Sequence, residues 1–501
     1  MGSFGRRAFI RGAVVLLGSA ALASCTRPTQ PEPAGQDSEP RTLPIPPVLE
    51  GSLVDGVRVF ELSAQAGVAE LLAGVSTPTW GFNGPHMGPT LLMRRGEQVR
   101  MQVTNDLDEM TAVHWHGMKL PAKADGGPHS PIEPGETWTA EFTVDQPAAT
   151  LWYHPHPHMK TALHCYRGLA GALLIDDPVT DSLALPHTYS VDDIPVVITD
   201  QKFTEDGHLD EVIDPDLGLM GTTPLINGQA NVKLDAQARR LRLRVLNGAG
   251  MRFYNVAFSD GRPFSIVATD SGLLSEPVEV EYALLGPAER VEIIVDLEPG
   301  EEVTLRSDPL SGNFGIPEGN DKAPDFGFQH SFDLLAITGP EGGAAPGQLP
   351  VKLDPAAAAV PSVDRAPERE FLLNTFQING LTMNMERVDV EIDHDGPEVW
   401  TVTNENPDWP HNFHIHDARF RILELTGTDV AQVGTYGWKD TVAIPPGATV
   451  RLAVEFGHFP DPTIPYMFHC HMLLHEDQGM MGQFVIVEPG EEAELGHMGH
   501  H

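Results

Sequence analysis

One alternating strand pattern occurs three times in this chain. The copies are "QVRMQVTN" (residues 98–105), "RLRLRVLN" (240–247) and "VWTVTNEN" (399–406). Each copy is followed by a proline-containing turn and a second alternating strand, in "EPGETWTAEFTV", "LGPAERVEIIVDL" and "IPPGATVRLAVEF". A period of two predicts strands, and long amphipathic helical patterns are scarce. The sequence therefore predicts an all-β chain with three consecutive copies of one β-sandwich unit.

The three repeats set the expected domain limits. We expect sandwich domains at residues 48–180, 181–358 and 359–490, with a linker before them at 26–47 and a tail after them at 491–501. The linker is rich in Pro, Glu, Gln and Ser and has little to bury, so it should be a flexible tether. The tail ends in "HMGHH" and is either a weak metal-binding end or a loose terminus.

Residues 1–25 have the features of a targeting segment. Arg6 and Arg7 precede an apolar run at residues 13–23 that is too short to span a bilayer, as in a twin-arginine export signal. "LASC" then ends at Cys25, which fits a bacterial lipoprotein cleavage site with Cys25 as the lipidated residue. The alternative is an ordinary signal-peptidase site that happens to end in cysteine. We expect export to the cell envelope, the periplasm or the exterior, with membrane contact only through a lipid anchor.

Composition excludes several classes of protein. Apolar residues make up 41% and charged residues 20% of the 501 residues, which excludes wholesale disorder and a polytopic membrane protein. The 70 Asp and Glu residues outnumber the 32 Lys and Arg residues, and the net charge is -38. Such a surface repels phosphate backbones, so we expect no nucleic-acid partner. The acidity either attracts metal cations or only keeps an exported protein soluble.

The segment "MFHCHMLLHEDQGMM" near the C-terminus contains soft metal ligands. Cys470, His475 and Met480 follow the spacing C-x4-H-x4-M, and a second candidate imidazole in the same repeat is His411. One thiolate, two imidazoles and a weak thioether match the ligands of blue-copper electron-transfer sites. A structural zinc site would require four firm ligands, and Met is a poor one. A disulfide to Cys165 is an alternative that would consume this ligand, so we interpret Cys165 as a lone, buried thiol.

Four H-x-H pairs occur in the first and third repeats. They are His114/His116, His154/His156, His414/His416 and His469/His471. The second repeat has "RFYN" and "VTLRS" at the corresponding places. A site where the first and third repeats face one another explains this asymmetry. On an extended strand His469 and His471 point away from the face that Cys470 uses, so they would serve a second metal centre a few bonds from the first. Eight imidazoles are the number required for a trinuclear copper cluster.

These motifs resemble those of the three-domain multicopper oxidases. The matching segments are "HWHG", "WYHPH", "HNFHIH", "GWKDT" and "HCHMLLHEDQGMM", and the resemblance covers nearly all of the expected mature chain. Within the family the chain looks most like the bacterial cuprous oxidases and the bilirubin oxidase and laccase-like enzymes near them. The resemblance implies cupredoxin-like Greek-key sandwiches and four coppers per chain.

The resemblance also implies a role for each ligand. The type 1 copper would be held by His411, Cys470, His475 and Met480; the type 2 copper by His114 and His414; one type 3 copper by His116, His154 and His471; and the other by His156, His416 and His469. Family members have an acid near the type 2 copper where this chain has Asp125, and an acid on the proton route to the type 3 pair where it has Glu476. Each would deliver protons for oxygen reduction, and the alternative for each is a hydrogen-bonded structural carboxylate.

The electron donor is less constrained. Cuprous oxidases of the family carry a Met-rich insert over the type 1 copper, and the corresponding residues 309–337 contain no Met. Trp409, two residues before His411, resembles the bilirubin oxidase pattern and would relay an electron from an aromatic donor or cover the copper. We therefore expect laccase-like oxidation of phenolic reductants coupled to four-electron reduction of dioxygen to water. The alternative is cuprous (metal-ion) oxidation in copper homeostasis.

Two non-enzymatic classes are distant alternatives. The family fold also serves a bacterial cell-division protein that lost its copper ligands, whereas in this chain every ligand position carries a His, Cys or Met. A copper storage or delivery lipoprotein does not need a thiolate next to four H-x-H pairs. The third repeat and the type 3 ligands exclude a two-domain copper nitrite reductase. We expect a monomer whose partners are dioxygen and a small reductant, either a phenol or Cu(I).

Overall fold

The computed structural model describes residues 39–310, 314, 326, 328–393, 395–429 and 432–495. The predicted signal segment with Cys25, most of the predicted linker and the end of the tail lie outside the described residues. Strands dominate the described part, and its longest helix has seven residues. Across these ranges no helix has both the length and the apolar character needed to cross a membrane.

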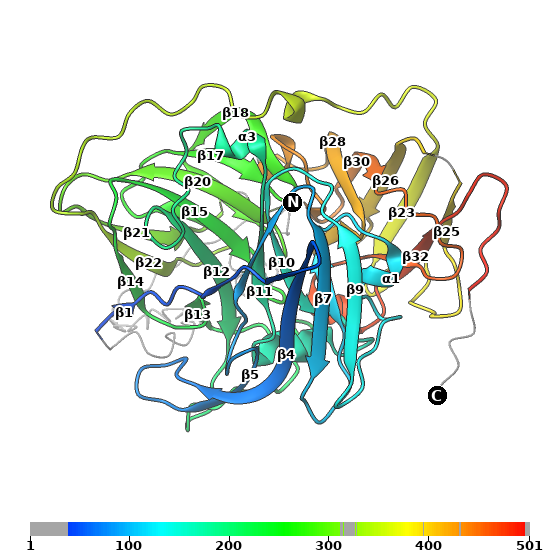
Figure 1. Ribbon diagram of the computed structural model, residues 1–501, viewed down its shortest axis with the longest axis horizontal. Helices are drawn as coiled ribbons and strands as arrows, with labels where there is room; N and C mark the ends of the chain where they lie inside the picture. Colours follow the sequence, from blue (N-terminus) through cyan, green and yellow to red (C-terminus); the bar gives the residue numbers. More distant parts are fainter. Residues whose placement is uncertain are drawn as a thin grey trace, which may run out of the picture. The chain divides into compact units, whose positions relative to one another are not determined.

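The first β-sandwich consists of two five-stranded sheets (Figure 1). Its strands are β2 (Val48–Leu49), β3 (Ser52–Val54), β4 (Val57–Ala69), β5 (Thr77–Phe82), β6 (Thr90–Arg94), β7 (Gln98–Asn105), β8 (Val113–His116), β9 (Thr137–Thr143), β10 (Ala149–Pro155) and β11 (Gly171–Asp176). One sheet has the order β3-β4-β7-β9, with β5 paired to β4, and the other has the order β2-β6-β11-β10-β8. The loops hold two short helices, α1 (Ala122–Asp125) and α2 (Thr161–Arg167).

The second β-sandwich consists of two six-stranded sheets. Its strands are β12 (Asp193–Gln201), β13 (Thr223–Ile226), β14 (Val232–Asp235), β15 (Arg240–Asn247), β16 (Tyr254–Phe258), β17 (Phe264–Thr269), β18 (Gly272–Val280), β19 (Tyr282–Leu285), β20 (Arg290–Asp296), β21 (Glu302–Ser307), β22 (Phe332–Thr338) and the N-terminal β1 (Arg41–Thr42). The sheet orders are β1-β14-β22-β21-β16-β19 and β13-β12-β15-β20-β17-β18. Helix α3 (Pro178–Asp181) precedes this sandwich.

The third β-sandwich again has two five-stranded sheets. Its strands are β23 (Glu368–Asn374), β24 (Gln377–Ile378), β25 (Val390–Ile392), β26 (Glu398–Asn404), β27 (His411–Ile415), β28 (Ala418–Thr426), β29 (Thr441–Ile444), β30 (Thr449–Phe456), β31 (Tyr466–His469) and β32 (Met481–Ile486). The sheet orders are β24-β23-β26-β30-β28 and β25-β32-β31-β27-β29. Helical turns are η2 (Pro355–Ala358), η3 (Val433–Thr435) and α4 (Leu473–Asp477).

The three alternating runs occupy equivalent positions in the three sandwiches. β7 pairs in parallel with β4 and antiparallel with β9. β15 pairs in the same way with β12 and β20, and β26 with β23 and β30. In each case the antiparallel partner is the strand after the proline turn. The all-β prediction of three consecutive Greek-key sandwiches is therefore confirmed.

β15 is more deeply buried than its alternating sequence suggests. Along β7, inward Val and Met side chains alternate with outward polar ones, as expected for a strand with one face on the core. On β15 the outward-facing Arg242 and Arg244 are also buried, at 2% and 5% exposed. They form ion pairs with Asp193 and Glu292, which compensate the cost of removing the charges from water.

Part of the predicted flexible linker is a strand. β1 pairs in parallel with β14 of the second sandwich, and the following Leu43 is buried in the core of that sandwich. Nη2 of Arg41 donates to the carbonyl oxygen of Leu71 at 2.7 Å. One charged residue, Arg41, and one apolar residue, Leu43, are enough to attach residues 41–43 to the folded body. The proline-rich composition of the segment alone does not reveal this.

Candidate metal centres

Two pairs of neighbouring strands, together with the one or two residues that follow their ends, carry the eight histidines of the H-x-H pairs, here called the histidine cluster. β8 pairs with β10, so that His114 lies opposite His154, and β27 pairs with β31, so that His414 lies opposite His469. All eight imidazoles are buried, with at most 1% of their surface exposed. The alternation of each strand directs both members of a pair to the same side.

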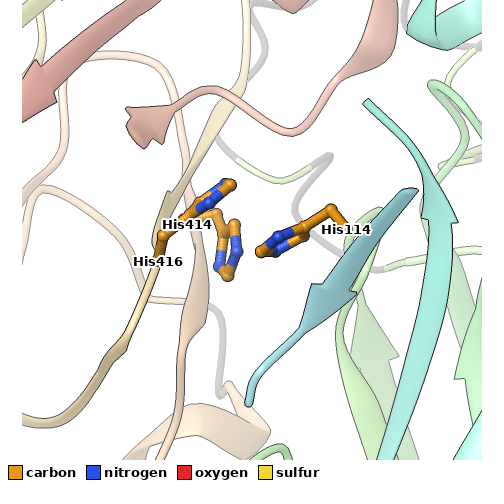
Figure 2. A group of neighbouring side chains, drawn as sticks. All are labelled: His114, His414 and His416. Carbon is orange, nitrogen blue, oxygen red and sulfur yellow. The ribbon is translucent and has the colours of Figure 1, made fainter. Parts of the chain in front are cut away.

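The rings of the first sandwich meet those of the third reciprocally. His114 stacks on His416, and His116 stacks on His414, each pair with ring centroids 3.8 Å apart. Figure 2 shows His114 directed from its strand toward His414 and His416, which come from the facing part of the third sandwich. The side chains of the two repeats therefore gather between them, as the asymmetry of the sequence predicts.

The donor atoms form groups in which all of them lie within 4.8 Å of one another. The groups are His114, His414 and His416; His116, His154 and His471; His156, His416 and His469; His411, Cys470 and His475; and His116, His414 and Asp440. Two of these have the same members as the predicted type 3 sets. The first contains the predicted type 2 pair together with His416. Buried imidazole and thiolate are donors that copper prefers, so these groups fit that metal.

Backbone carbonyls orient the two predicted type 2 ligands. Nδ1 of His114 donates to the carbonyl oxygen of Asp125 at 3.0 Å, and Nδ1 of His414 donates to that of Asp440 at 2.9 Å. Each imidazole therefore keeps an unprotonated Nε2, and both Nε2 atoms are buried without a hydrogen-bond partner. A metal ion would satisfy these two lone pairs, which are costly to bury unpaired.

His116 has the opposite orientation. Its Nε2 lies 3.1 Å from the carboxylate oxygen Oδ1 of Asp440 and donates to it, and its Nδ1 is buried without a partner. Nδ1 is therefore the nitrogen that His116 can offer to the group that it forms with His154 and His471. Nε2 of His154 and Nε2 of His471 are 3.4 Å apart.

Burial favours the neutral form of eight of the ten candidate ligand histidines. It lowers the pKa well below its ordinary value at His116, His154, His411, His414, His416 and His471, to about 4 at His156 and to about 3 at His475. A neutral imidazole retains the lone pair that binds a metal ion. The electrostatics of the site therefore favour metal binding over protonation.

His411, Cys470 and His475, here called the type 1 group, form a small triangle of donor atoms. Nδ1 of His411 is 3.1 Å from Nδ1 of His475, and Sγ of Cys470 lies 3.6 and 3.4 Å from these two nitrogens. Metal–imidazole bonds are about 2 Å long, so a triangle of this size leaves room for one cation between the three atoms. Burial raises the pKa of the Cys470 thiol to about 12, so a cation that binds there displaces a proton.

The fourth predicted type 1 ligand is next to this triangle. Met480 is fully buried, and its carbonyl oxygen accepts a hydrogen bond from the backbone N–H of Cys470 at 3.1 Å. Its own backbone N–H donates to the carbonyl oxygen of His475 at 2.9 Å. The spacing C-x4-H-x4-M thus closes a loop through α4 that returns the chain to Cys470.

Both predicted proton-delivery residues contact the histidine cluster. Asp125 ends α1, and its Oδ2 lies 2.7 Å from Nδ1 of His416. Glu476 lies in α4, with Oε2 3.2 Å from Nδ1 of His469 and Oε1 3.5 Å from Nδ1 of His156. Each of the two residues is 2% exposed, which is rare for an acid without a specific partner. Carboxyl groups in this position can hold or release a proton next to the rings.

Trp409 contacts the type 1 group through His475. Its indole nitrogen Nε1 lies 2.8 Å from Nε2 of His475. The half-buried indole also packs edge-on against Phe326 of the second sandwich, with ring centroids 5.3 Å apart. Nε2 of His411 donates instead to Oδ1 of Asn406 at 2.8 Å. Trp409 thus contacts His475, which is distant in the sequence, rather than His411, which is only two residues away.

A cavity of about 350 Å³ lies where residues of all three sandwiches meet. Its lining includes Trp438 and two residues that directly follow histidines of the cluster, Gly117 and Asp417. Neither Trp409 nor the type 1 group lines it. A reductant that contacts Trp409 would therefore bind at the surface rather than in this cavity.

The two described cysteines are free thiols, so the disulfide alternative is wrong. Cys470 is buried in the type 1 group, whereas Cys165 is partly exposed rather than buried, because it lies in α2, a short helix in a loop of the first sandwich. Sequence reasoning also gave no role to Asp440, although its segment "GWKDT" was among the family matches. Its contacts with His116 and His414 join distant parts of the chain, and nothing in its spacing reveals them.

Comparison with known proteins is consistent with this geometry. Sequence models described as multicopper oxidase match residues 63–180 and 352–490. The multicopper oxidase mco of Staphylococcus haemolyticus is 34% identical over 438 residues, which cover 86% of this chain and 89% of that protein. The cell division protein FtsP of Yersinia pestis is 33% identical over 491 residues, which cover 97% of this chain and 99% of that protein. A solved structure of a laccase from Pediococcus acidilactici superposes with a TM-score of 0.79 and 33% identity, over 90% of this chain and 94% of that chain.

Proposed function

Because the chain belongs to the multicopper oxidase family, we propose that it is a laccase-like oxidase that couples one-electron oxidation of phenolic and similar aromatic reductants to four-electron reduction of dioxygen to water. The family implies copper as the cofactor, with dioxygen and a reductant as substrates. The observation that carries the proposal is the closeness of His411, Cys470 and His475, in a chain where Cys470 is flanked by two residues of the histidine cluster. An electron-transfer site directly joined to a multi-imidazole site is what such a coupling requires.

We assign four coppers to the groups described above. His411, Cys470, His475 and Met480 would hold the type 1 copper; His114 and His414 the type 2 copper; His116, His154 and His471 one type 3 copper; and His156, His416 and His469 the other. Bound copper would supply single-electron transfer at the first site and oxygen reduction at the other three.

Cys470 connects the two sites through the chain itself. Its neighbours His469 and His471 belong to two different groups of the histidine cluster. Only a few covalent bonds therefore separate the thiolate from imidazoles of both groups. All three side chains are buried, so water is kept from the connecting segment.

Asp125 and Glu476 are the residues that we propose to supply protons for oxygen reduction. Oδ2 of Asp125 and Oε2 of Glu476 each lie within hydrogen-bond distance of a ring nitrogen of the cluster, at 2.7 and 3.2 Å. They contact histidines of different H-x-H pairs, His416 and His469. Two separate carboxyl groups would allow protons to reach the cluster from two sides.

Trp409 is the residue that we propose to receive electrons from an aromatic donor. It is partly exposed on one side, and its indole nitrogen lies against Nε2 of His475 on the other. An aromatic reductant can stack on an exposed indole without entering a pocket. This favours outer-sphere transfer from a range of phenols over a narrow substrate specificity.

Oxidation of Cu(I) in copper homeostasis is the second candidate. The net charge of -38 favours attraction of metal cations. Residues 309–337 contain no Met, however, and Met is the soft ligand that Cu(I) prefers. This difference is why we rank phenolic reductants first.

A non-enzymatic role is the distant alternative. A structural role is supported by the similarity to a protein named for cell division. A copper-binding lipoprotein is the other such role, and it would require fewer metal ligands than an oxidase. Neither role requires a cysteine sulfur within 3.6 Å of two imidazole nitrogens, in a residue whose two neighbours in the sequence are also histidines.

We also propose export by the twin-arginine route through Arg6 and Arg7, followed by lipid attachment at Cys25 in the cell envelope.

Oxygen uptake by the copper-loaded protein tests the proposal. We expect faster uptake with a simple phenol than with stabilised Cu(I), and a blue protein. A matched variant, Cys470→Ser, keeps the size of the side chain but removes the thiolate, so it should be colourless and reduce uptake to background with either donor. Faster uptake with Cu(I) would replace the laccase-like assignment by metal-ion oxidation. A blue protein that consumes no oxygen with either donor would contradict both.

A further inference from the structure

The second sandwich contributes no histidine to the cluster, yet one of its arginines reaches the cluster's supporting residues. Arg290 is the first residue of β20 and is fully buried. Its Nη1 donates to Oδ1 of Asp440 at 2.7 Å, and its Nη2 donates to Oδ2 of Asp440 at 2.6 Å. The same Oδ1 accepts from Nε2 of His116. A continuous hydrogen-bonded path thus runs from the second sandwich to a predicted type 3 ligand.

The position of Arg290 departs from the repeat. The turns "PGET", "PAER" and "PGAT" precede β9, β20 and β30, so Arg290 stands where the first and third sandwiches have Thr137 and Thr449. Those threonines form cross-strand hydroxyl pairs with Thr104 and Thr403, at 2.8 and 2.9 Å. A sandwich of this kind folds with threonine at this position. The guanidinium of Arg290 donates to the carbonyl oxygens of Ala288 and Asp270 in its own sandwich, and it additionally reaches Asp440 of the third.

The segment "GWKDT" attaches the third sandwich to the second around this contact. The carbonyl oxygen of Trp438 accepts from Oγ1 of Thr269 at 2.8 Å. Nζ of Lys439 forms ion pairs with Asp270 and Glu289, both at 2.9 Å. At Gly437 an added Cβ would come within 2.2 Å of Oγ1 of Thr269, so only glycine permits this approach. The backbone that carries Asp440 is thus fixed against the second sandwich.

The surroundings hold Asp440 in one orientation. Nε of Arg290 donates to the carbonyl oxygen of Thr150 at 3.0 Å, and the backbone N–H of Arg290 donates to Oδ1 of Asp270 at 2.7 Å. At Gly117, directly after His116, an added Cβ would lie 2.7 Å from Oδ2 of Asp440 and 2.8 Å from Nη2 of Arg290. The ion pair therefore packs directly on the strand that carries His116. A bidentate arginine–carboxylate pair has a defined geometry, unlike a lysine contact.

We propose that Arg290 is a positioning residue for the trinuclear centre: through its bidentate pair with Asp440 it fixes the ring of His116 with Nδ1 directed at His154 and His471. The sandwich without ligands thereby takes part in building the metal site between the other two. This inference rests on the proposed copper assignment, and Arg290 itself contacts neither metal nor substrate.

Arg290→Lys tests the proposal because it keeps the positive charge but cannot form the bidentate pair of hydrogen bonds with Asp440. We expect the affinity for trinuclear copper, measured by chelator titration with metal analysis, to fall about 10- to 100-fold, the usual range for loss of a residue that orients a ligand. The type 2 electron paramagnetic resonance signal should change as well. The blue absorption of the type 1 group should remain, which shows that the chain is folded and binds copper.

Three further variants separate positioning from stability. Asp440→Asn keeps an oxygen for His116 but cannot form the bidentate pair, so it should reproduce the effects of Arg290→Lys, and the double variant should be no worse than either single one. Arg242→Lys makes the same change at a buried ion pair of the same sandwich that does not touch the cluster. It should lower stability and leave the trinuclear signals intact.

Unchanged trinuclear copper in both Arg290→Lys and Asp440→Asn, or an equal loss in Arg242→Lys, would overturn the inference. Failure of the wild-type protein to bind copper would instead overturn the proposed function.

Discussion

At the scale of single residues, Glu476 offers a direct test of proton delivery. Glu476→Gln keeps the shape of the side chain and one oxygen next to His469, but it cannot release a proton. We expect oxygen uptake to slow on the order of a hundredfold, because the carboxylate that would accept and pass on protons is lost. The blue colour should remain, since Glu476 is not one of the proposed ligands of the type 1 group. Oxygen uptake and the visible spectrum, recorded on the same sample, measure both quantities.

The neighbouring acid provides the control for this prediction. Asp477 follows Glu476 in α4 but accepts hydrogen bonds from the backbone N–H groups of Thr161 and Ala162, at 2.9 and 3.0 Å, and does not contact the cluster rings. Asp477→Asn should therefore slow uptake much less than Glu476→Gln. Equal losses in the two variants would point to damage to α4, and a wild-type rate in Glu476→Gln would remove the residue from the mechanism.

Trp409 can be separated from the type 1 group by a comparison of donors. Trp409→Phe preserves aromatic packing against Phe326 but removes the indole nitrogen that lies against His475. Because the proposed electron path loses the indole nitrogen, we expect oxidation of phenols to slow about fivefold, which corresponds to about 1 kcal/mol in the activation free energy. A small inorganic reductant that does not stack on the indole should be oxidised at nearly the wild-type rate. Steady-state rates with the two donors decide the point: an equal decrease for both would mean that Trp409 tunes the copper and does not receive the electron.

At the scale of elements, periodicity predicts both the fold and the members of the site. A period of two determines which residues share a face, so the H-x-H pairs had to point the same way and Cys470 the opposite way. The same period placed β7, β15 and β26 as equivalent strands. Each of these strands also ends in an asparagine whose Nδ2 donates to the carbonyl oxygen two residues before the turn proline. These bonds are Asn105 to Ile132, Asn247 to Leu285 and Asn404 to Ile444, at 2.7, 2.9 and 3.1 Å.

What the sequence did not predict depends on packing between elements that are far apart in the chain. The repeated asparagine was visible, but its partner lies 27 to 40 residues away in the three copies. Arg290 and Asp440 are 150 residues apart, and Trp409 and His475 are 66 apart. A local pattern gives the face of a strand, but it does not give the residue of another sandwich that will lie against that face. For the same reason, the burial of Arg242 on an alternating strand was not foreseen.

At the scale of the whole molecule, buried charges link the first and second sandwiches and should make stability depend on pH. Glu292 accepts from Nε of Arg242 at 2.8 Å, from Nη1 of Arg244 at 2.9 Å and from Oγ1 of Thr150 in the first sandwich at 2.6 Å. Burial alone would raise the pKa of Glu292, but attraction to the two arginines and these hydrogen bonds lower it from 4.5 to about 2. The contribution to stability is therefore complete above about pH 4.5 and is lost as the pH falls toward 2.

Glu292→Gln removes this titration. The variant should be less stable than the wild type at neutral pH by on the order of 3 kcal/mol, and the difference should shrink between pH 5 and about pH 2. Denaturant unfolding at a series of pH values measures it. Glu141→Gln, at the exposed ion pair with Arg100, is the matched control and should change the free energy of unfolding by less than about 1 kcal/mol. Parallel pH curves for Glu292→Gln and the wild type would refute the assignment.

The reciprocal stacking of His114 on His416 and His116 on His414 is the contact pattern of an isologous dimer, in which the same patch on two copies meets itself. Here both copies belong to one polypeptide. Joined copies meet at an effective concentration set by the chain and not by the solution. Formation of the cluster is therefore a unimolecular event, and dilution of the protein, which would separate the halves of a true dimer, leaves this one assembled.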